Sequence, residues 1–135
     1  MVNAIIIEAR TNSSRLPGKV LKKVLNKPLL EFQIERLKKV KNCDEIIIAT
    51  TTNSDDDEII KIAIENKIKF FRGPELDVLQ RVLDTAIYFS VKNIIEIPGD
   101  CPLIDAKYVD FNINEFFKRK IDYLSSHLSK TWPNG

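Results

Sequence analysis

The chain has 135 residues, of which 44% are hydrophobic and 30% are charged, and these values are ordinary for one soluble domain. No apolar run approaches the roughly 20 residues of a membrane span, which excludes an integral membrane helix. Two cysteines and one histidine are too few for a standard zinc site or a disulfide framework. An apolar strand pattern begins directly after Met1, so we expect no signal peptide and a cytoplasmic location.

The net charge of +2 is unevenly distributed along the chain. Residues 1–44 carry ten Lys and Arg against four Asp and Glu, whereas residues 45–135 carry eleven against fifteen. A basic first third suits an anionic ligand, and RNA is one alternative, which steep salt dependence of affinity would support. We rank RNA last, because lysines 38, 39 and 41 fall on a predicted amphipathic helix and no aromatic stacking platform is visible.

Strand and helix patterns alternate along the chain. Apolar runs predict five strands, at residues 4–7, 45–49, 67–71, 94–97 and 121–125. Between them, helical periodicity predicts helices from residues 29, 55, 75 and 106, with Ser54 or Asp55 and then Asp105 as helix caps. Parallel strands need crossover connections, so this alternation predicts an α/β fold. We expect a Rossmann-like, open and mostly parallel sheet with helices on both faces.

A loop rich in hydrogen-bond donors follows the first predicted strand. Its polar and turn-forming members are Arg10, Thr11, Asn12, Ser13, Ser14, Arg15, Pro17, Gly18 and Lys19. No carboxylate occurs between Ala9 and Leu30, and the loop leaves the carboxyl end of a strand, where open α/β sheets bind ligands. Guanidinium, ammonium and hydroxyl groups suit a polyanion such as a nucleotide triphosphate. The loop lacks the glycine and lysine spacing of a Walker motif.

The letters A-R-T-N-S-S-R-L-P-G-K-V-L at residues 9–21 resemble the signature loop of the cytidylyltransferase family. The stretch R-G…D-V-L-x-R at 72–81 is similar to a motif of its spore-coat-polysaccharide branch, and G-D-C-P-L-I-D at 99–105 is similar to the metal-binding loop of the family. The resemblance implies the nucleotide-diphospho-sugar transferase type of fold. It implies nucleotide contacts from Ala9, Arg10, Ser13, Ser14, Arg15, Lys19, Thr50, Arg72, Gly73 and Asp77, with Arg15 and Lys19 as catalytic residues.

Asp100 is the predicted metal ligand. It stands in a Gly-Asp-x-Pro turn just after a predicted buried strand, and Mg²⁺ prefers hard oxygen ligands. The resemblance implies the same role, because the family's corresponding loop binds Mg²⁺ through its first Asp. The acidic run at residues 55–58 is better explained as a helix start, where carboxylates complement the helix dipole. The alternative for Asp77 is an acidic residue in the first turn of a helix. The alternative for Arg81 is an ion pair with Asp77 or Glu75.

The resemblance implies transfer of CMP from CTP to an acidic or related sugar, with release of pyrophosphate, for surface polysaccharide synthesis. Trp132 to Gly135 resemble a segment after which family members continue with a second half, so we expect residues 1–135 to form a single nucleotide-binding domain that lacks this half. A truncated nucleotide-binding module without catalytic activity is therefore the alternative. Glu8 and Glu96 stand where the branch often has glutamine and arginine, and His127 is not needed for the chemistry. The expected partners are CTP and a sugar acceptor, not nucleic acid or a membrane, and an exposed sheet edge would favour a homodimer.

Overall fold

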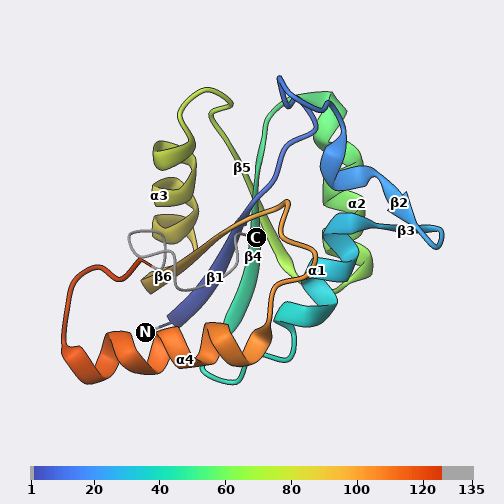
Figure 1. Ribbon diagram of the computed structural model, residues 1–135. Helices are drawn as coiled ribbons and strands as arrows, with labels where there is room; N and C mark the ends of the chain where they lie inside the picture. Colours follow the sequence, from blue (N-terminus) through green and yellow to red (C-terminus); the bar gives the residue numbers. More distant parts are fainter. Residues whose placement is uncertain (1, 126–135) are drawn as a thin grey trace.

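The computed structural model describes residues 2–125, and its centre is a four-stranded sheet whose paired strands are all parallel. In chain order the strands are β1 (Val2–Glu8), β4 (Glu45–Thr51), β5 (Lys69–Gly73) and β6 (Val91–Pro98). Their spatial order is β5-β4-β1-β6, so β1 and β4 lie in the middle (Figure 1). Burial on both faces explains the unbroken apolar run of β1, in which Ala4, Ile5, Ile6 and Ile7 are each 0% exposed.

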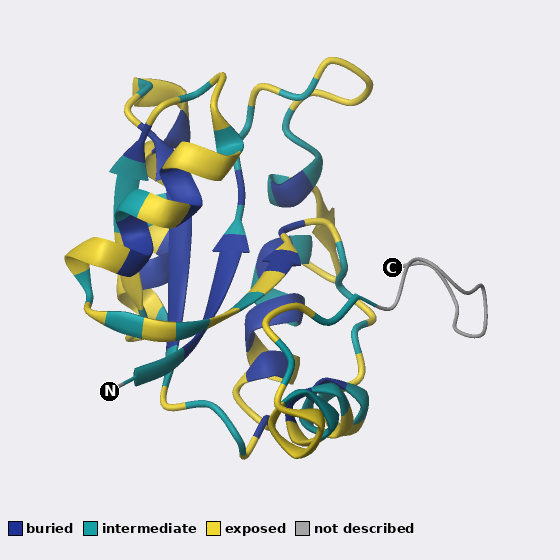
Figure 2. Cartoon of the chain, turned by 90° about the vertical axis from the view of Figure 1, so that its left-hand side faces the viewer, coloured by how far each residue is buried: buried dark blue, intermediate teal, exposed yellow. Residues whose placement is uncertain are grey.

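Helices cover both faces of the sheet. The three that share one face are α1 (Leu29–Leu37), α2 (Asp57–Glu65) and α4 (Ala106–Arg119), and α3 (Val78–Tyr88) covers the other. Alternate β1 side chains supply the two cores: Ile5 and Ile7 pack with the three-helix side, whereas Ile6 packs with α3. Figure 2 shows that the buried residues are concentrated in the central strands and in parts of the helices beside them. The predicted Rossmann-like α/β architecture is confirmed. None of the helices within residues 2–125 combines the length and apolar character that crossing a membrane requires.

A short irregular region separates β1 from α1. It contains a 3-10 turn, η1 (Lys19–Leu21), and a small hairpin of β2 (Lys23–Val24) and β3 (Lys27–Pro28). Leu25 and Asn26 form the two-residue hairpin loop with φ of 50° and 64°, as a tight hairpin turn requires. A second 3-10 turn, η2 (Ser54–Asp56), precedes α2. These turns place the loop after β1 beside the loop after β4.

Two predicted strands differ in the structure. The predicted fifth strand at residues 121–125 is wrong: α4 ends at Lys120 in a left-handed conformation, and Tyr123 stays 79% exposed. Apolar character alone does not make a strand, which also needs pairing with a neighbouring strand, and none of the described strands pairs with this segment. The third strand was predicted to begin at residue 67, but in the structure it begins at Lys69. Lys67 has a φ of 55°, and pairing with β4 starts at Lys69. His127 and the segment from Trp132 to Gly135 lie outside the described residues.

Candidate functional site

The donor-rich loop after β1 is closed by its own backbone. The carbonyl of Thr11 accepts hydrogen bonds from the amides of Ser13 at 2.9 Å and Gly18 at 2.7 Å. Gly18 has a φ of 67°, a conformation that glycine adopts without steric cost, and η1 begins immediately after it. Ser14 and Arg15 are exposed on this loop, and Arg15 makes no hydrogen bond or ion pair with any described residue. The loop therefore holds a fixed path while its donors remain open to a ligand.

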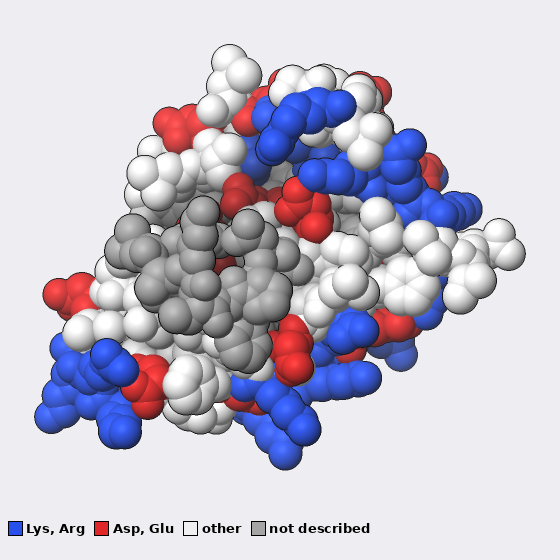
Figure 3. Space-filling model, in the orientation of Figure 1, with Lys and Arg blue, Asp and Glu red and all other residues white. Residues whose placement is uncertain are grey.

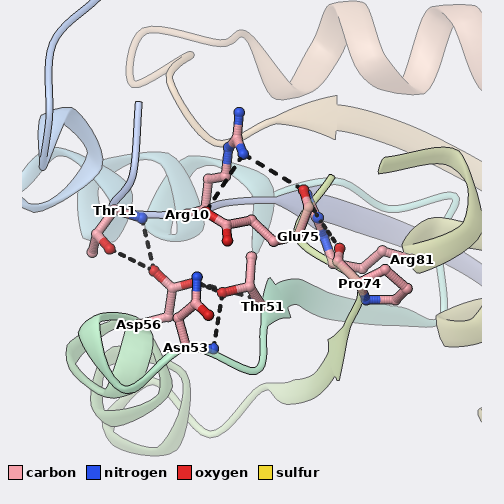
Figure 4. A network of polar contacts seen from close by, with 8 residues as sticks. All are labelled: Arg10, Thr11, Thr51, Asn53, Asp56, Pro74, Glu75 and Arg81. Carbon is pink, nitrogen blue, oxygen red and sulfur yellow. Dashed lines mark hydrogen bonds and ion pairs between the residues drawn. The ribbon is translucent and has the colours of Figure 1, made fainter. Parts of the chain in front are cut away.

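Asp56 fixes this loop to the end of β4. Its side chain is only 1% exposed, and its two oxygens accept from Thr11 on this loop and from Thr51 at the end of β4 (Figure 4). Oδ1 accepts from the amide and the hydroxyl of Thr11, each at 2.7 Å, and Oδ2 accepts from the amide of Thr51 at 3.2 Å and from its hydroxyl. Burial alone would raise the pKa of Asp56, but the bonds from Thr51 and Thr11 outweigh it, so the pKa lies below its ordinary value.

This role of Asp56 was missed in the sequence, where the acidic run was interpreted as a helix start capped by Ser54 or Asp55. Neither residue caps α2; both lie in the 3-10 turn η2. The polar groups that need an acceptor are on Thr11 and Thr51, and Thr11 is 45 residues away in the chain. Only the fold, which brings the loops after β1 and β4 to one sheet edge, shows that Asp56 is the common acceptor for Thr11 and Thr51.

A second group of polar contacts links the loop after β1 to the segment between β5 and α3. Arg81 of α3 is 1% exposed, and its guanidinium donates to the carbonyls of Pro74 at 2.6 Å and Glu75 at 3.2 Å (Figure 4). Arg10, in the loop after β1, also contacts Glu75: its Nη1 lies 3.5 Å from the Glu75 carbonyl oxygen and 3.9 Å from the Glu75 carboxylate. The predicted ion pair of Arg81 with Asp77 or Glu75 is wrong, because its described partners are backbone carbonyls.

The structure brings together the lysine of the loop after β1 and the carboxylate predicted to bind metal. Lys19 Nζ donates to Asp100 Oδ2 at 2.5 Å, although the two residues are 81 positions apart in the chain. Both side chains are partly exposed, at 33% and 38%, so the pair faces solvent and not the core. Two motifs that the sequence analysis treated separately therefore meet at one point on the carboxyl edge of the sheet.

Asp100 can serve a Mg²⁺ ion only together with other oxygen donors. Within the described residues, no group of three His, Cys, Asp or Glu side chains could enclose a metal ion. A single exposed carboxylate beside a cationic loop fits a Mg²⁺ that keeps several waters and takes phosphate oxygens from a nucleotide. The neighbouring Cys101 does not compete, because burial and the charge of Asp100 raise the pKa of its thiol, which stays protonated and is a soft ligand.

The remaining predicted nucleotide contacts have different environments. Thr50 is fully buried in β4, and its hydroxyl has no hydrogen-bond partner among the described residues. Arg72 pairs with Asp57 at the start of α2. A side chain at Gly73 would approach Arg81 Cγ to 3.0 Å, so the glycine allows this packing. Arg72 and Gly73 thus have roles within the fold.

Asp77 caps α3 by accepting from the amide of Gln80 at 2.9 Å, as the helix-acid alternative predicted. In the same way, the predicted cap of α4 is confirmed, because Asp105 accepts from the amide of Lys107 at 2.7 Å. Of the predicted nucleotide contacts, Ser14, Arg15 and Asp77 are exposed, whereas Ala9 is buried.

Basic side chains gather at the top and upper right of the face shown in Figure 3, over the loop after β1 and η1, with acidic side chains at their lower border. One carboxylate at this edge is Glu8, the last residue of β1. Its pKa is raised, first by burial and then by the negative charges of Glu96 and Asp100, while Arg81 and Arg10 act in the opposite sense. In the β1–β6 register Ile6 faces Glu96 and Glu8 faces Pro98, so both glutamates lie on the α3 side.

Comparison with known proteins places this arrangement in a family. A family model described as cytidylyltransferase matches residues 4–132. The chain belongs to the cytidylyltransferase family. It is 40% identical over 121 residues to an uncharacterised protein of Methanocaldococcus jannaschii, covering 90% of this chain and 50% of that protein. It is 34% identical over 122 residues to the spore coat polysaccharide biosynthesis protein SpsF of Bacillus subtilis, covering 87% of this chain and 51% of SpsF.

Solved structures agree with this assignment. A cytidylyltransferase from Leptospira borgpetersenii superposes with a TM-score of 0.85 and 38% identity, over 89% of this chain and 50% of that one. A CMP:2-keto-3-deoxy-manno-octonic acid synthetase complexed with CTP superposes with a TM-score of 0.76 at 23% identity, over 89% of this chain and 49% of that one, which shows a shared fold. The chain spans about half the length of these cytidylyltransferase relatives.

Proposed function

We propose that this chain binds CTP with Mg²⁺ and takes part in transferring CMP to an acidic or related sugar, with release of pyrophosphate. The observation that carries the proposal is the contact of Lys19 with Asp100, which joins the cationic loop to the carboxylate predicted to bind metal. Such a pair is what a metal-bound triphosphate requires: a cation for the phosphate oxygens and a hard oxygen for the metal. Family membership supports CTP as the nucleotide.

In the proposed reaction an oxygen of the sugar attacks the α-phosphorus of CTP. The new oxygen–phosphorus bond forms as the bond to the β-phosphate breaks; pyrophosphate leaves, and the proton of the attacking hydroxyl passes to solvent. Arg15 and Lys19 would hold the triphosphate oxygens, Arg10, Ser13 and Ser14 would supply further donors, and Asp100 would hold the Mg²⁺. Mg²⁺ supplies neutralisation of the negative charge that the phosphates carry. The protein's contribution is positioning and charge stabilisation, as in other phosphoryl transfers.

A nucleotide-binding module without transfer activity is the second candidate. It concerns residues 1–135 alone, which span about half the length of the relatives they match. Both candidates require CTP binding at the same loop. They differ in whether pyrophosphate is released when a sugar acid is added.

The decisive experiment measures CTP binding by calorimetry with and without Mg²⁺, for the wild type, Asp100→Ala and Arg15→Ala. We expect Mg²⁺ to tighten CTP binding in the wild type, the gain to vanish in Asp100→Ala, and Arg15→Ala to weaken binding by about tenfold, as for loss of one charged hydrogen bond. Arg119→Ala, on the exposed side of α4, is the matched control and should bind as the wild type does. CTP binding that is unaffected by Mg²⁺, by Asp100→Ala and by Arg15→Ala would refute the proposal. Pyrophosphate release with a sugar acid separates transfer from binding alone.

A further inference from the structure

The buried face of α1 contains one polar side chain. Four α1 residues are fully buried, and three of them, Leu30, Ile34 and Leu37, are apolar residues of the core. The fourth is Gln33, which is 0% exposed. A buried amide destabilises the fold unless its hydrogen-bonding groups find partners, so a glutamine here needs a specific explanation.

Both ends of the Gln33 amide bind the loop that carries Asp100. Nε2 donates to the carbonyl of Pro98 at 2.7 Å, and Oε1 accepts from the amide of Cys101 at 3.0 Å. A carbonyl can only accept and a backbone amide can only donate, so a group offering both a donor and an acceptor is needed to satisfy the pair. The two anchored residues flank Gly99 and Asp100, and Gln33 therefore fixes the loop on both sides of the carboxylate.

The opposite side of the same loop rests against the end of β1. The amide of Gly99 donates to the carbonyl of Glu8 at 2.8 Å. A side chain at Gly99 would come within 2.8 Å of that oxygen and 2.9 Å of Ala9 Cβ, so only glycine fits this approach. Residues 98–101 are thus held between α1 and β1, and the direction in which Asp100 projects toward Lys19 depends on both supports.

We propose that Gln33 is a positioning residue for the metal-binding loop, holding Asp100 where it meets Lys19 and a Mg²⁺-bound triphosphate; its metal-related part rests on the function proposed above. Gln33 does not touch the ligand. Its effect passes through the backbone of Pro98 and Cys101, whose positions set the direction of the Asp100 side chain. A misplacement of this carboxylate would weaken the link between Mg²⁺ and CTP binding while leaving the cationic loop after β1 intact.

The test compares Gln33→Leu, which has a similar volume but neither polar group, with Ile34→Val, a mild change in the same helix that is confined to the apolar core. The first readout is amide hydrogen exchange of Cys101 in the free protein. We expect exchange about tenfold faster in Gln33→Leu, as for loss of one hydrogen bond, and little change in Ile34→Val. Gln33→Glu keeps an acceptor for Cys101 and should give a smaller effect, which also serves if Gln33→Leu does not fold.

The second readout is the ratio of CTP affinities with and without Mg²⁺, measured by calorimetry. We expect this ratio to fall in Gln33→Leu toward that of Asp100→Ala, while CTP affinity without Mg²⁺ stays close to that of the wild type. Unchanged Cys101 exchange in both Gln33 variants would overturn the proposal, and so would an unchanged Mg²⁺ ratio with only a lower melting temperature. If the wild type shows no Mg²⁺ effect, the proposed function fails, and the exchange measurement still decides whether Gln33 holds the loop.

Discussion

Replacing Asp56 by asparagine should destabilise the protein more than its place in a run of acidic residues suggests. The carboxylate accepts four hydrogen bonds, two at each oxygen, and each pair includes a backbone amide, that of Thr11 or that of Thr51. In Asp56→Asn one of these oxygens becomes an NH₂ group. The threonine hydroxyls can rotate to accept from it, but a backbone amide cannot, so one amide loses its acceptor whichever way the new side chain is placed.

The magnitude follows from these contacts. An orphaned buried donor costs about 1–3 kcal/mol, and the remaining hydrogen bonds weaken because their acceptor is no longer charged. Relief of the burial of a charge offsets part of this loss. We therefore expect Asp56→Asn to lower the free energy of unfolding by about 2–4 kcal/mol, measured by urea denaturation at pH 7. Asp55→Asn is the matched control, since Asp55 is exposed, and should stay within about 0.5 kcal/mol.

The pH dependence gives a second check. The pKa of Asp56 is lowered by folding, so its stabilisation is present in full above the unfolded-state pKa of about 3.9 and is lost as the pH falls through the lower folded-state value. The difference between wild type and Asp56→Asn should be constant from neutral pH down to about pH 4.5 and shrink only below that. A difference of less than about 0.5 kcal/mol at pH 7, or one that already changes between pH 5 and 7, would refute this account of the Asp56 contacts.

Two further predictions concern the groups around the site. Arg81→Met leaves the carbonyl of Pro74 without its donor and the carbonyl of Glu75 with only the longer contact from Arg10, so the free energy of unfolding should fall by about 2–3 kcal/mol. Arg119→Met, on an exposed ion pair, should cost under about 0.5 kcal/mol, and equal effects in chemical denaturation would contradict the assignment. Glu8→Gln removes a carboxylate whose pKa folding raises, so it should stabilise the protein at pH 8. This advantage should shrink as the pH falls through the raised folded-state pKa and be absent below the unfolded-state pKa of about 4.3. Thermal melts across this range test the sign, and a gain that persists at pH 4 would count against it.

The sequence predicted much of the fold because strands that are buried on both faces of a parallel sheet appear in the sequence as unbroken apolar runs. The apolar runs in β1 and β4 cannot be explained by a half-exposed strand, and the caps Asp77 and Asp105 precede helices with clear periodicity. The prediction of a strand at residues 121–125 was wrong because it rested on a local pattern alone. Its alternation is compatible with a strand, but a strand also needs a hydrogen-bonded neighbour, which a local pattern does not reveal.

By itself, the sequence determined the α/β architecture, the cationic loop after β1 and the separate Gly-Asp turn, because each is encoded by residues close together in the chain. Only the tertiary structure decided which of these meet. Lys19 contacts Asp100 across 81 positions, Thr11 contacts Asp56 across 45, and Gln33 reaches Pro98 across 65. These contacts follow from the parallel order of β4, β1 and β6, which brings the carboxyl ends of distant strands to one edge. Buried polar side chains such as Gln33, Asp56 and Arg81 look ordinary in the sequence, because their partners are backbone groups that only the completed fold supplies.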